Sequence, residues 1–410
     1  MFKNNNFIIG DENCKIINEE TFNYLVKNIK IGDFEQNYSC IPIENQIFWK
    51  NQTNLELEKL INQIKNRNAA TISLEEKSTF YKRDNPYISI VITLYNQDYY
   101  INTVYAFIQQ QSLKDIEIIF VDDASTDNCS IIVKELMKFD KRIIYIKNPL
   151  NKKQFYSINI GVLFSKGEYI ISIDPDDLLL NDILIKAYET AKYYNLDILQ
   201  FYMISGFSLW TEVKYKNGII CNNENIRKIY YYGMTRNLPD KLIRRNIFLK
   251  SISFMKKDLF YMDYHIHTDD TIFFGIIHFA RSYGFLEQIG YFYNQDPKRN
   301  LINNIIKEKI IKQNEDLKSL FNIMKYFILQ SDNNEIEKNN IPLKFFEQKV
   351  AKYLNIVINN IFKEFDFYVD ILNLYLNCSF FSKDKKEIIK KYKAKIINKS
   401  IERSNKNYEF

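Results

Sequence analysis

The chain has 410 residues, 46% of them hydrophobic, which is enough length for more than one domain and enough apolar surface for a core. This composition excludes a largely disordered protein. The net charge of +6 is mild, and basic residues are interleaved with acidic ones, so we expect no nucleic-acid partner.

The first 85 residues contain no group of side chains that points to chemistry. Residues 54–66 place leucine and isoleucine at helical spacing, so we predict a mainly helical extension over residues 1–85. The polar stretch 75–85 ends at Pro86, which is typical of a linker into a new unit. We predict that this unit is a catalytic domain over residues 86–300.

From Pro86 onward, short apolar runs alternate with segments of helical spacing. This alternation implies βαβ units, so we predict an α/β fold with a Rossmann-like, mostly parallel sheet flanked by helices. Ligands of such sheets bind beyond the carboxyl ends of the strands. The predicted strands are Ile88–Leu94, Glu117–Val121, Arg142–Lys147, Tyr169–Ile173 and Asp197–Phe201; the predicted helices are Tyr100–Gln111, Asp127–Lys138, Phe155–Ser165 (with Gly167 as C-cap) and Asp182–Tyr194.

Three carboxylates, Asp174, Asp176 and Asp177, follow the fourth predicted strand directly. Carboxylates placed just past a buried strand are costly unless a positive charge binds them. Their hard oxygen atoms suit Mn²⁺ or Mg²⁺, with a nucleotide diphosphate completing the coordination. The alternative is a turn or a helix N-cap, since aspartate favours both.

Two further groups follow the first and second predicted strands. Asp123, after Val121, could accept hydrogen bonds from a base or a ribose, while Ser125 to Asp127 cap the next helix. Thr93 and Tyr95 end the first strand, where Tyr95 could stack on a nucleobase or pack in the core. Because all three groups fall at strand ends, we expect them to share one edge of the sheet.

The ordered series of these motifs resembles a family 2 glycosyltransferase. The resemblance rests on Pro86–Asn96, Leu113–Asn128, Lys166–Ile170 and Asp174–Asp177. It implies the glycosyltransferase A fold, an inverting transfer and a nucleotide-sugar donor, with UDP as the expected nucleotide. It further implies that Thr93, Tyr95, Asp123 and Asp174 hold the nucleotide and that Asp176 binds the metal, with Asp174 and Asp176 forming the DxD motif.

The resemblance continues downstream. Asp240–Arg245 is similar to the family's lysine-leucine-x-arginine segment, and Asp269–Phe274 to its later acidic pair. The second acid of that pair, Asp270, is implied as the catalytic base that takes the acceptor's proton. The alternative for both acids is favourable charge at a helix N-terminus. The expected acceptor is a hydroxyl of a glycan, lipid or protein.

Some residues depart from the family pattern or allow two interpretations. Asn294 stands where the family often has arginine, which leaves a catalytically inactive, nucleotide-binding or scaffold relative as the alternative function. His265 and His267 lie beside the acidic pair, where they could bind metal or diphosphate or serve in packing. Lys241, Arg244 and Arg245 could reach phosphates or form a solvated helix face.

Other nucleotide-binding classes lack their motifs here. The loop after the first predicted strand, 93–98, contains no glycine, which excludes a dinucleotide-binding Rossmann fingerprint. No GxxxxGK[ST] run occurs either, which excludes a P-loop NTPase.

Residues 301–410 are predicted to form a helical region. Its last segment, Lys383–Arg403, is rich in lysine and could contact an anionic membrane peripherally or remain an exposed terminal helix. No run reaches the roughly 18–20 apolar residues that span a bilayer, and no secretory signal is apparent. We therefore expect a cytoplasmic protein, with any membrane contact at the cytosolic face.

Overall fold

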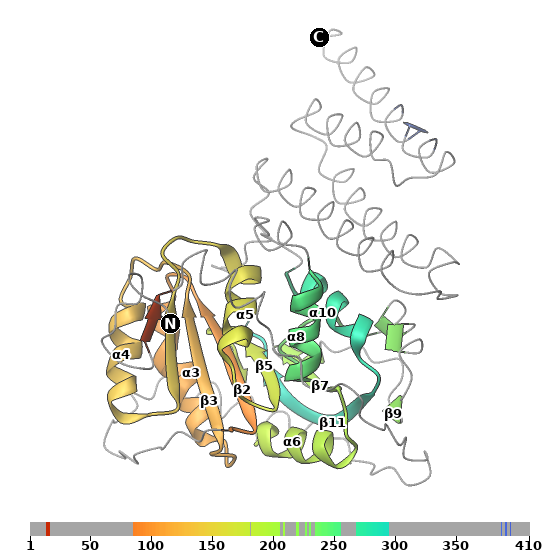
Figure 1. Ribbon diagram of the computed structural model, residues 1–410, viewed down its shortest axis with the longest axis horizontal. Helices are drawn as coiled ribbons and strands as arrows, with labels where there is room; N and C mark the ends of the chain where they lie inside the picture. Colours follow the sequence, from red (N-terminus) through yellow and green to blue (C-terminus); the bar gives the residue numbers. More distant parts are fainter. Residues whose placement is uncertain are drawn as a thin grey trace, which may run out of the picture.

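The computed structural model describes residues 85–294, except 181, 206–207, 210–218, 221–225, 228, 231–233 and 256–267, together with 14–16, 387, 390–391 and 394. Within them a single mixed sheet carries helices on both faces (Figure 1). The predicted boundary at 85/86 lies at the start of this region, and the one at 300/301 falls outside it. The basic C-terminal segment lies almost wholly outside the described residues, so its proposed membrane contact stays a prediction.

The strands follow the order β1-β4-β3-β2-β5-β10-β7-β11-β6 across the sheet. β4, β3, β2 and β5 pair in parallel, as do β7 and β11, whereas β10 runs antiparallel between β5 and β7. The bounds are β1 (Cys14–Ile16), β2 (Ile88–Leu94), β3 (Ile116–Asp122), β4 (Ile143–Lys147), β5 (Tyr169–Ile173), β6 (Leu178–Leu179), β7 (Ile198–Ser205), β8 (Ser208–Leu209), β9 (Ile219–Ile220), β10 (Lys241–Arg244) and β11 (Tyr283–Phe292).

Alternating side chains of the central strands feed two cores, because successive residues of a strand point to opposite faces. On β3, Ile119 and Val121 join the core beneath α5, α8 and α10. Ile118 and Phe120 join the core beneath α3, α4 and α6. The helices are α3 (Asp98–Gln110), α4 (Cys129–Phe139), α5 (Lys153–Phe164), α6 (Ile183–Tyr193), α8 (Arg245–Phe254) and α10 (Thr268–Phe279).

The predicted α/β architecture is confirmed, with every predicted strand and helix present within a few residues of its expected bounds. Among the described residues, six strands lie outside that prediction: β1, β6, β8, β9, β10 and β11. β10 is only four residues long and ends in charged side chains, so it lacks an apolar strand signature. β1 lies in the region predicted to be mainly helical and pairs with the edge strand β4.

The prediction that Gly167 caps a helix is wrong. α5 ends at Phe164, and the residue after it, Ser165, already has extended backbone geometry. Gly167 instead lies against the start of β2, where an added Cβ would be 2.4 Å from Oγ of Ser89 and 2.5 Å from its backbone nitrogen. Close approach of two backbones, rather than a left-handed turn, is therefore why this position needs glycine.

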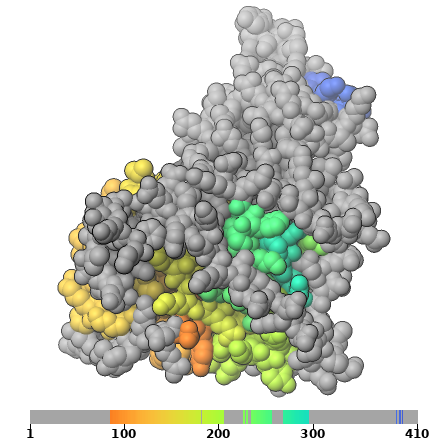
Figure 2. Space-filling model, viewed as in Figure 1, coloured from red at the N-terminus to blue at the C-terminus, as the bar shows by residue number. Residues whose placement is uncertain are grey.

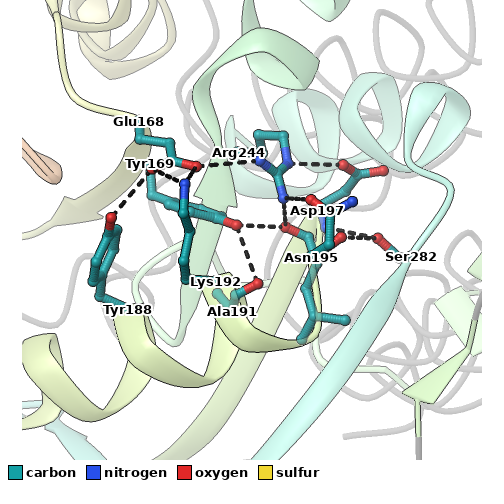
Figure 3. A network of polar contacts seen from close by, with 10 residues as sticks. Glu168, Tyr169, Tyr188, Ala191, Lys192, Asn195, Asp197, Arg244 and Ser282 are labelled. Atoms are coloured by element: carbon teal, nitrogen blue, oxygen red, sulfur yellow. Dashed lines mark hydrogen bonds and ion pairs between the residues drawn. The ribbon is translucent and has the colours of Figure 1, made fainter. Parts of the chain in front are cut away.

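The edge of the sheet at the amino ends of the parallel strands is tied together by Arg244 (Figure 3). Its Nε donates to Oδ1 of Asp197 at 3.1 Å, and one Nη donates to Oδ1 of Asn195 at 2.8 Å. The other Nη is 3.5 Å from Oε1 of Glu168, and the guanidinium lies over the ring of Tyr169. Arg244 is buried and committed to this network, so neither a phosphate-binding role nor a solvated face describes it.

Figure 2 shows the same face of the molecule in space-filling form, with α8 and α10 in green and teal beside the yellow and orange half that contains β2 and α5. α5, α8 and α10 pack against one another on this face. In the part of the chain that the structure describes, no helix combines the length and the apolar character needed to cross a bilayer.

Gly161 tests the packing of α5 on the sheet. A Cβ added there would lie 2.4 Å from Cγ1 of Val91 and 3.2 Å from Cγ2 of Val121. We expect Gly161→Ala to lower the free energy of unfolding by about 1–3 kcal/mol, because a packed core resists extra atoms. At a helix position with open space around it, glycine to alanine raises the free energy of unfolding by about 1 kcal/mol. The sign of the change in the free energy of unfolding therefore distinguishes a packed position from an open one.

Urea denaturation measures this effect. In a Val91→Ala background, which removes the obstructing methyl groups, Gly161→Ala should cost much less than in the natural protein. Equal costs in both backgrounds would contradict the packing explanation.

Candidate functional site: an acidic edge of the sheet

The carboxyl ends of three neighbouring parallel strands meet at one edge. Leu94 of β2 is level with Asp122 of β3, and Ile92 is level with Ile173 of β5. The residues that follow these strands therefore lie along the same edge, as the strand order predicts.

The loops after β2 and β3 hold each other. The side-chain oxygen of Asn96 accepts from the backbone N–H of Thr126 at 2.8 Å, and the N–H of Asp98 donates to Oδ2 of Asp127 at 2.9 Å. Asn96 and Ala124 both have positive φ angles, 54° and 63°. Non-glycine residues adopt such angles where their surroundings fix them, so the paired loops form a defined rim.

The two acids after β3 have different tasks. Asp122 is fully buried and accepts hydrogen bonds from the Tyr145 hydroxyl and the backbone N–H of Ser125, so it stabilises the loop. Asp123, a predicted nucleotide contact, accepts from the N–H groups of Lys152 and Lys153 at 2.8 and 2.7 Å. It thereby caps α5. Of the residues Ser125 to Asp127, which were predicted to cap the next helix, Asp127 does so in part: its Oδ1 accepts from the N–H of Cys129 at 3.1 Å.

Asp123 also accepts from the side-chain amide of Asn148 at 2.8 Å. An ionised carboxylate has about four acceptor positions, so three protein donors leave it capacity for one more. Above it on the rim, Tyr95 is 50% exposed and Thr93 is half-buried. Packing in the core therefore does not explain Tyr95, whose ring remains available to a ligand.

Residues 174–177 form the acid turn, which leads from β5 to β6, two strands that β10, β7 and β11 separate in the sheet. Asp177 is buried inside it and accepts from the Tyr291 hydroxyl at 2.7 Å and from the backbone N–H of Asn294 at 2.8 Å. Asp174 accepts from the side-chain amide of Gln154 at 2.8 Å. Asp174 and Asp176 are half-buried.

The acid turn concentrates carboxylates that repel one another when they are ionised. Burial, then the neighbouring Asp269 and Asp176, raise the pKa of Asp174 to about 8. Burial, then Asp174 and Asp176, raise the pKa of Asp177 well above its ordinary value. Carboxylates that resist ionisation in this way favour a cation between them.

The donor set suits a divalent cation shared with phosphates. Both oxygens of Asp177 are committed to Tyr291 and Asn294, which leaves Asp174 and Asp176 as candidate ligands. Among the described residues, no group of three or more metal-ligating side chains is assembled. Mg²⁺ and Mn²⁺ commonly bind through one or two carboxylates and complete their shell with substrate phosphates and water, so these residues fit such an ion.

A second acidic pair begins α10. Asp269 faces the acid turn closely enough to be the foremost neighbouring charge that raises the pKa of Asp174. Burial, and then Asp270, raise the pKa of Asp269 itself to about 7. Asp270 is buried, and its Oδ1 lies 3.7 Å from Nε of Arg236.

The lysine of the Lys241–Arg244 segment is committed elsewhere. Lys241 is fully buried, and its Nζ donates to the carboxylate of Asp240 and the backbone oxygen of Asn237. Its ammonium lies 4.8 Å from the ring centre of Phe273 on α10. Lys241 therefore supports α10 from beneath instead of reaching a phosphate. Arg245 likewise donates to the side chain of Ser165, at 3.0 Å.

Sequence reasoning missed Tyr291, Gln154 and Arg236, because each meets its acid through contacts between residues far apart in the chain. The available sequence signal was that Tyr291 lies three residues before Asn294, the position where the family often has arginine. His265 and His267 lie outside the described residues.

The clustering of carboxylates predicts a pH dependence. The folded-state pKa of Asp269, about 7, exceeds its ordinary value, so between these values the folded protein holds a proton that the unfolded chain has lost. Stability from this group therefore falls as pH rises. In the presence of a metal chelator, we expect Asp269→Asn to be more stable than the natural protein at about pH 8.5 by at least about 1 kcal/mol, and by clearly less at about pH 5, because the effect grows only between the two pKa values.

Thermal denaturation at the two pH values measures this difference. Glu189→Gln, an exposed position on α6, serves as the control and should change neither curve. A stabilising effect of Asp269→Asn that is equal at both pH values would show that charge is not its cause.

Comparison with known proteins agrees with this geometry. Residues 89–259 match the family described as Glycosyl transferase family 2. An uncharacterized glycosyltransferase of Haemophilus influenzae is 37% identical over 101 residues, which cover 25% of this chain and 40% of that protein. The GalNAc(5)-diNAcBac-PP-undecaprenol beta-1,3-glucosyltransferase of Campylobacter jejuni is 36% identical over 108 residues, which cover 26% of this chain and 35% of the relative. The chain thus spans well under half the length of these relatives.

Among solved structures, S. aureus TarS 1-349 in complex with UDP superposes with a TM-score of 0.56. The match is 17% identical and covers 79% of this chain and 92% of the TarS chain. At this identity the likeness concerns the fold, and it confirms the predicted glycosyltransferase A architecture. Residues 89–259 thus match the glycosyltransferase family 2 model, and the strand order and the acid turn of this region agree with that match.

Proposed function

We propose that this chain is a metal-dependent, inverting glycosyltransferase that moves a sugar from a nucleotide-sugar, a UDP-sugar, to an acceptor hydroxyl. The observation that carries the proposal is the acid turn, whose clustered carboxylates lie at the carboxyl edge of the sheet beside the second acidic pair. Phosphates reach such a cluster only with a cation, and a nucleotide-sugar supplies the phosphates.

The rim after β2 and β3 would hold the nucleoside. Tyr95 offers an exposed aromatic face to the base, and Thr93 lies beside it at the strand end. Asp123 would use its remaining acceptor capacity for an N–H or hydroxyl of the nucleoside. The choice of UDP is supported by the TarS structures, which hold UDP and UDP-GlcNAc on the same fold.

The acid turn would hold the diphosphate end. Asp176 is assigned as the direct ligand of Mn²⁺ or Mg²⁺, with Asp174 beside it contacting the donor. When bound, the cation stabilises the negative charge that develops on the departing diphosphate. Gln154 and Tyr291 keep Asp174 in place while that charge moves.

Asp270 is assigned as the base. In a single displacement the acceptor oxygen forms its bond to the anomeric carbon as the bond to the diphosphate breaks, and a carboxylate takes the hydroxyl proton. Arg236 lies beside this acid, with its Nε 3.7 Å from Oδ1 of Asp270. Asp269 provides an internal comparison, because it is the adjacent acid and faces the acid turn.

The acceptor is a glycan, lipid or protein. The name of the Campylobacter relative describes a glucose transfer to a glycan on a polyprenyl diphosphate. That precedent supports testing lipid-linked glycans first.

Removal of Asp176 tests donor binding. We expect the natural protein to bind UDP more tightly with Mn²⁺ than without it, and Asp176→Ala to lose at least about tenfold of the Mn²⁺-dependent affinity, because a direct ligand is gone. Titration calorimetry measures both affinities, and Glu189→Ala should match the natural protein. If UDP, GDP and TDP all fail to bind the natural protein, an inactive scaffold relative is the better explanation.

Separate substitutions of the two acids of α10 test which of them is the catalytic base. We expect Asp270→Asn to lower kcat by about 10²–10⁴-fold while the affinity for UDP and Mn²⁺ stays unchanged, because only proton transfer is lost. A radiolabelled-sugar transfer assay measures this loss alongside calorimetry. A larger loss for Asp269→Asn than for Asp270→Asn would reassign the base to Asp269.

A further inference from the structure

Tyr291 lies at the far end of β11, more than 110 residues from the acid turn in sequence, and touches it at two points. Its hydroxyl donates to Oδ2 of Asp177 at 2.7 Å and accepts from the backbone N–H of Asp174 at 3.2 Å. The side chain is fully buried. One phenol oxygen thus spans the turn from its first residue to its last.

The surrounding pairing fixes where that oxygen lies. β6, directly after the acid turn, pairs with β11 so that Tyr291 is opposite Leu179 and Phe292 is opposite Leu178. Three residues after Tyr291, the backbone N–H of Asn294 donates to the second oxygen of Asp177 at 2.8 Å. The end of β11 therefore fixes the path of the acid turn through strand pairing and hydrogen bonds.

These contacts oppose the electrostatic repulsion between the carboxylates of the acid turn. Asp174, Asp176 and Asp177 place three carboxylates within four consecutive residues, and ionised carboxylates this close repel one another. Without a cation, that repulsion favours opening of the turn. A buried tyrosine opposes it at little entropic cost, because a phenol ring has few rotamers to lose and its hydroxyl both donates and accepts.

We propose that Tyr291 is a positioning residue for the donor site: it holds the acid turn in the shape that receives the metal and diphosphate, and contacts neither. The proposal rests on the function proposed above. That function assigns the nucleoside to the rim after β2 and β3, which Tyr291 does not touch. The Tyr291 hydroxyl should therefore affect binding of the diphosphate with its cation and not binding of the nucleoside.

The test is Tyr291→Phe, which removes one oxygen atom and keeps the ring. Its matched control is Tyr169→Phe, another fully buried tyrosine in the same sheet. The Tyr169 hydroxyl donates to the backbone oxygens of Leu196 at 3.0 Å and Ala191 at 3.3 Å, at the opposite edge (Figure 3). Both variants lose a buried hydroxyl, so both should lose comparable stability, on the order of 1–2 kcal/mol.

Calorimetry with UDP, with and without Mn²⁺, and with uridine separates the two roles. We expect Tyr291→Phe to reduce the affinity for UDP with Mn²⁺ by roughly 10–100-fold, the range found when a residue that supports a metal ligand is lost. Its affinity for uridine should stay within about twofold of the natural protein's. Tyr169→Phe should leave every affinity unchanged.

Three results would overturn the positioning role: an unchanged Mn²⁺-dependent affinity in Tyr291→Phe, an equal loss in Tyr169→Phe, or an equal loss for uridine. If Tyr291→Phe alone does not fold, the double variant with Asp177→Asn removes the charge left without its donor. This double variant carries the same expectation, with Asp177→Asn alone as its reference. Failure of the natural protein to bind UDP at all would instead sink the proposed function, so the two failures are distinguishable.

Discussion

Several carboxylates that repel one another are confined to one edge of a sheet, and much of the surrounding structure opposes that repulsion. Tyr291, the N–H of Asn294 and the amide of Gln154 each donate to an acid of the turn. The N-termini of α5 and α10 lie at the same edge, where the helix dipole favours negative charge and where α5 donates to Asp123. The clustering of these carboxylates therefore costs stability, as the arrangement of functional sites commonly does.

At the opposite edge of the sheet, the carboxylates are paired with a basic side chain. Arg244 meets Asp197 and Glu168 in a satisfied network, where every carboxylate has a cationic or N–H donor. At this edge the charges of the acidic and basic side chains cancel, and their contacts stabilise the starts of three strands. The Lys241–Arg244 strand connects the two situations, with its lysine beneath the acidic pair and its arginine in the neutral network.

Local sequence was sufficient for the parallel half of the sheet, because Ile88–Leu94 and Tyr169–Ile173 are β-branched runs between clear turn signals. Strand order then placed the acid turn on the ligand-binding edge. Sequence could not reveal β10, whose four residues carry a charge at each end, nor the contact of Gly167 with Ser89, which depends on how two distant backbones meet. For the same reason Asp123 was recognised as a ligand candidate but not as the cap of α5.

The brevity of β10 has a mechanical consequence. It is bonded to β5 over two register pairs and to β7 over three, whereas β2 and β3 share seven. This makes β10 a seam between the half that would carry the nucleoside and the half that carries α10. Slow amide exchange should thus distinguish two cooperative units that meet at this strand.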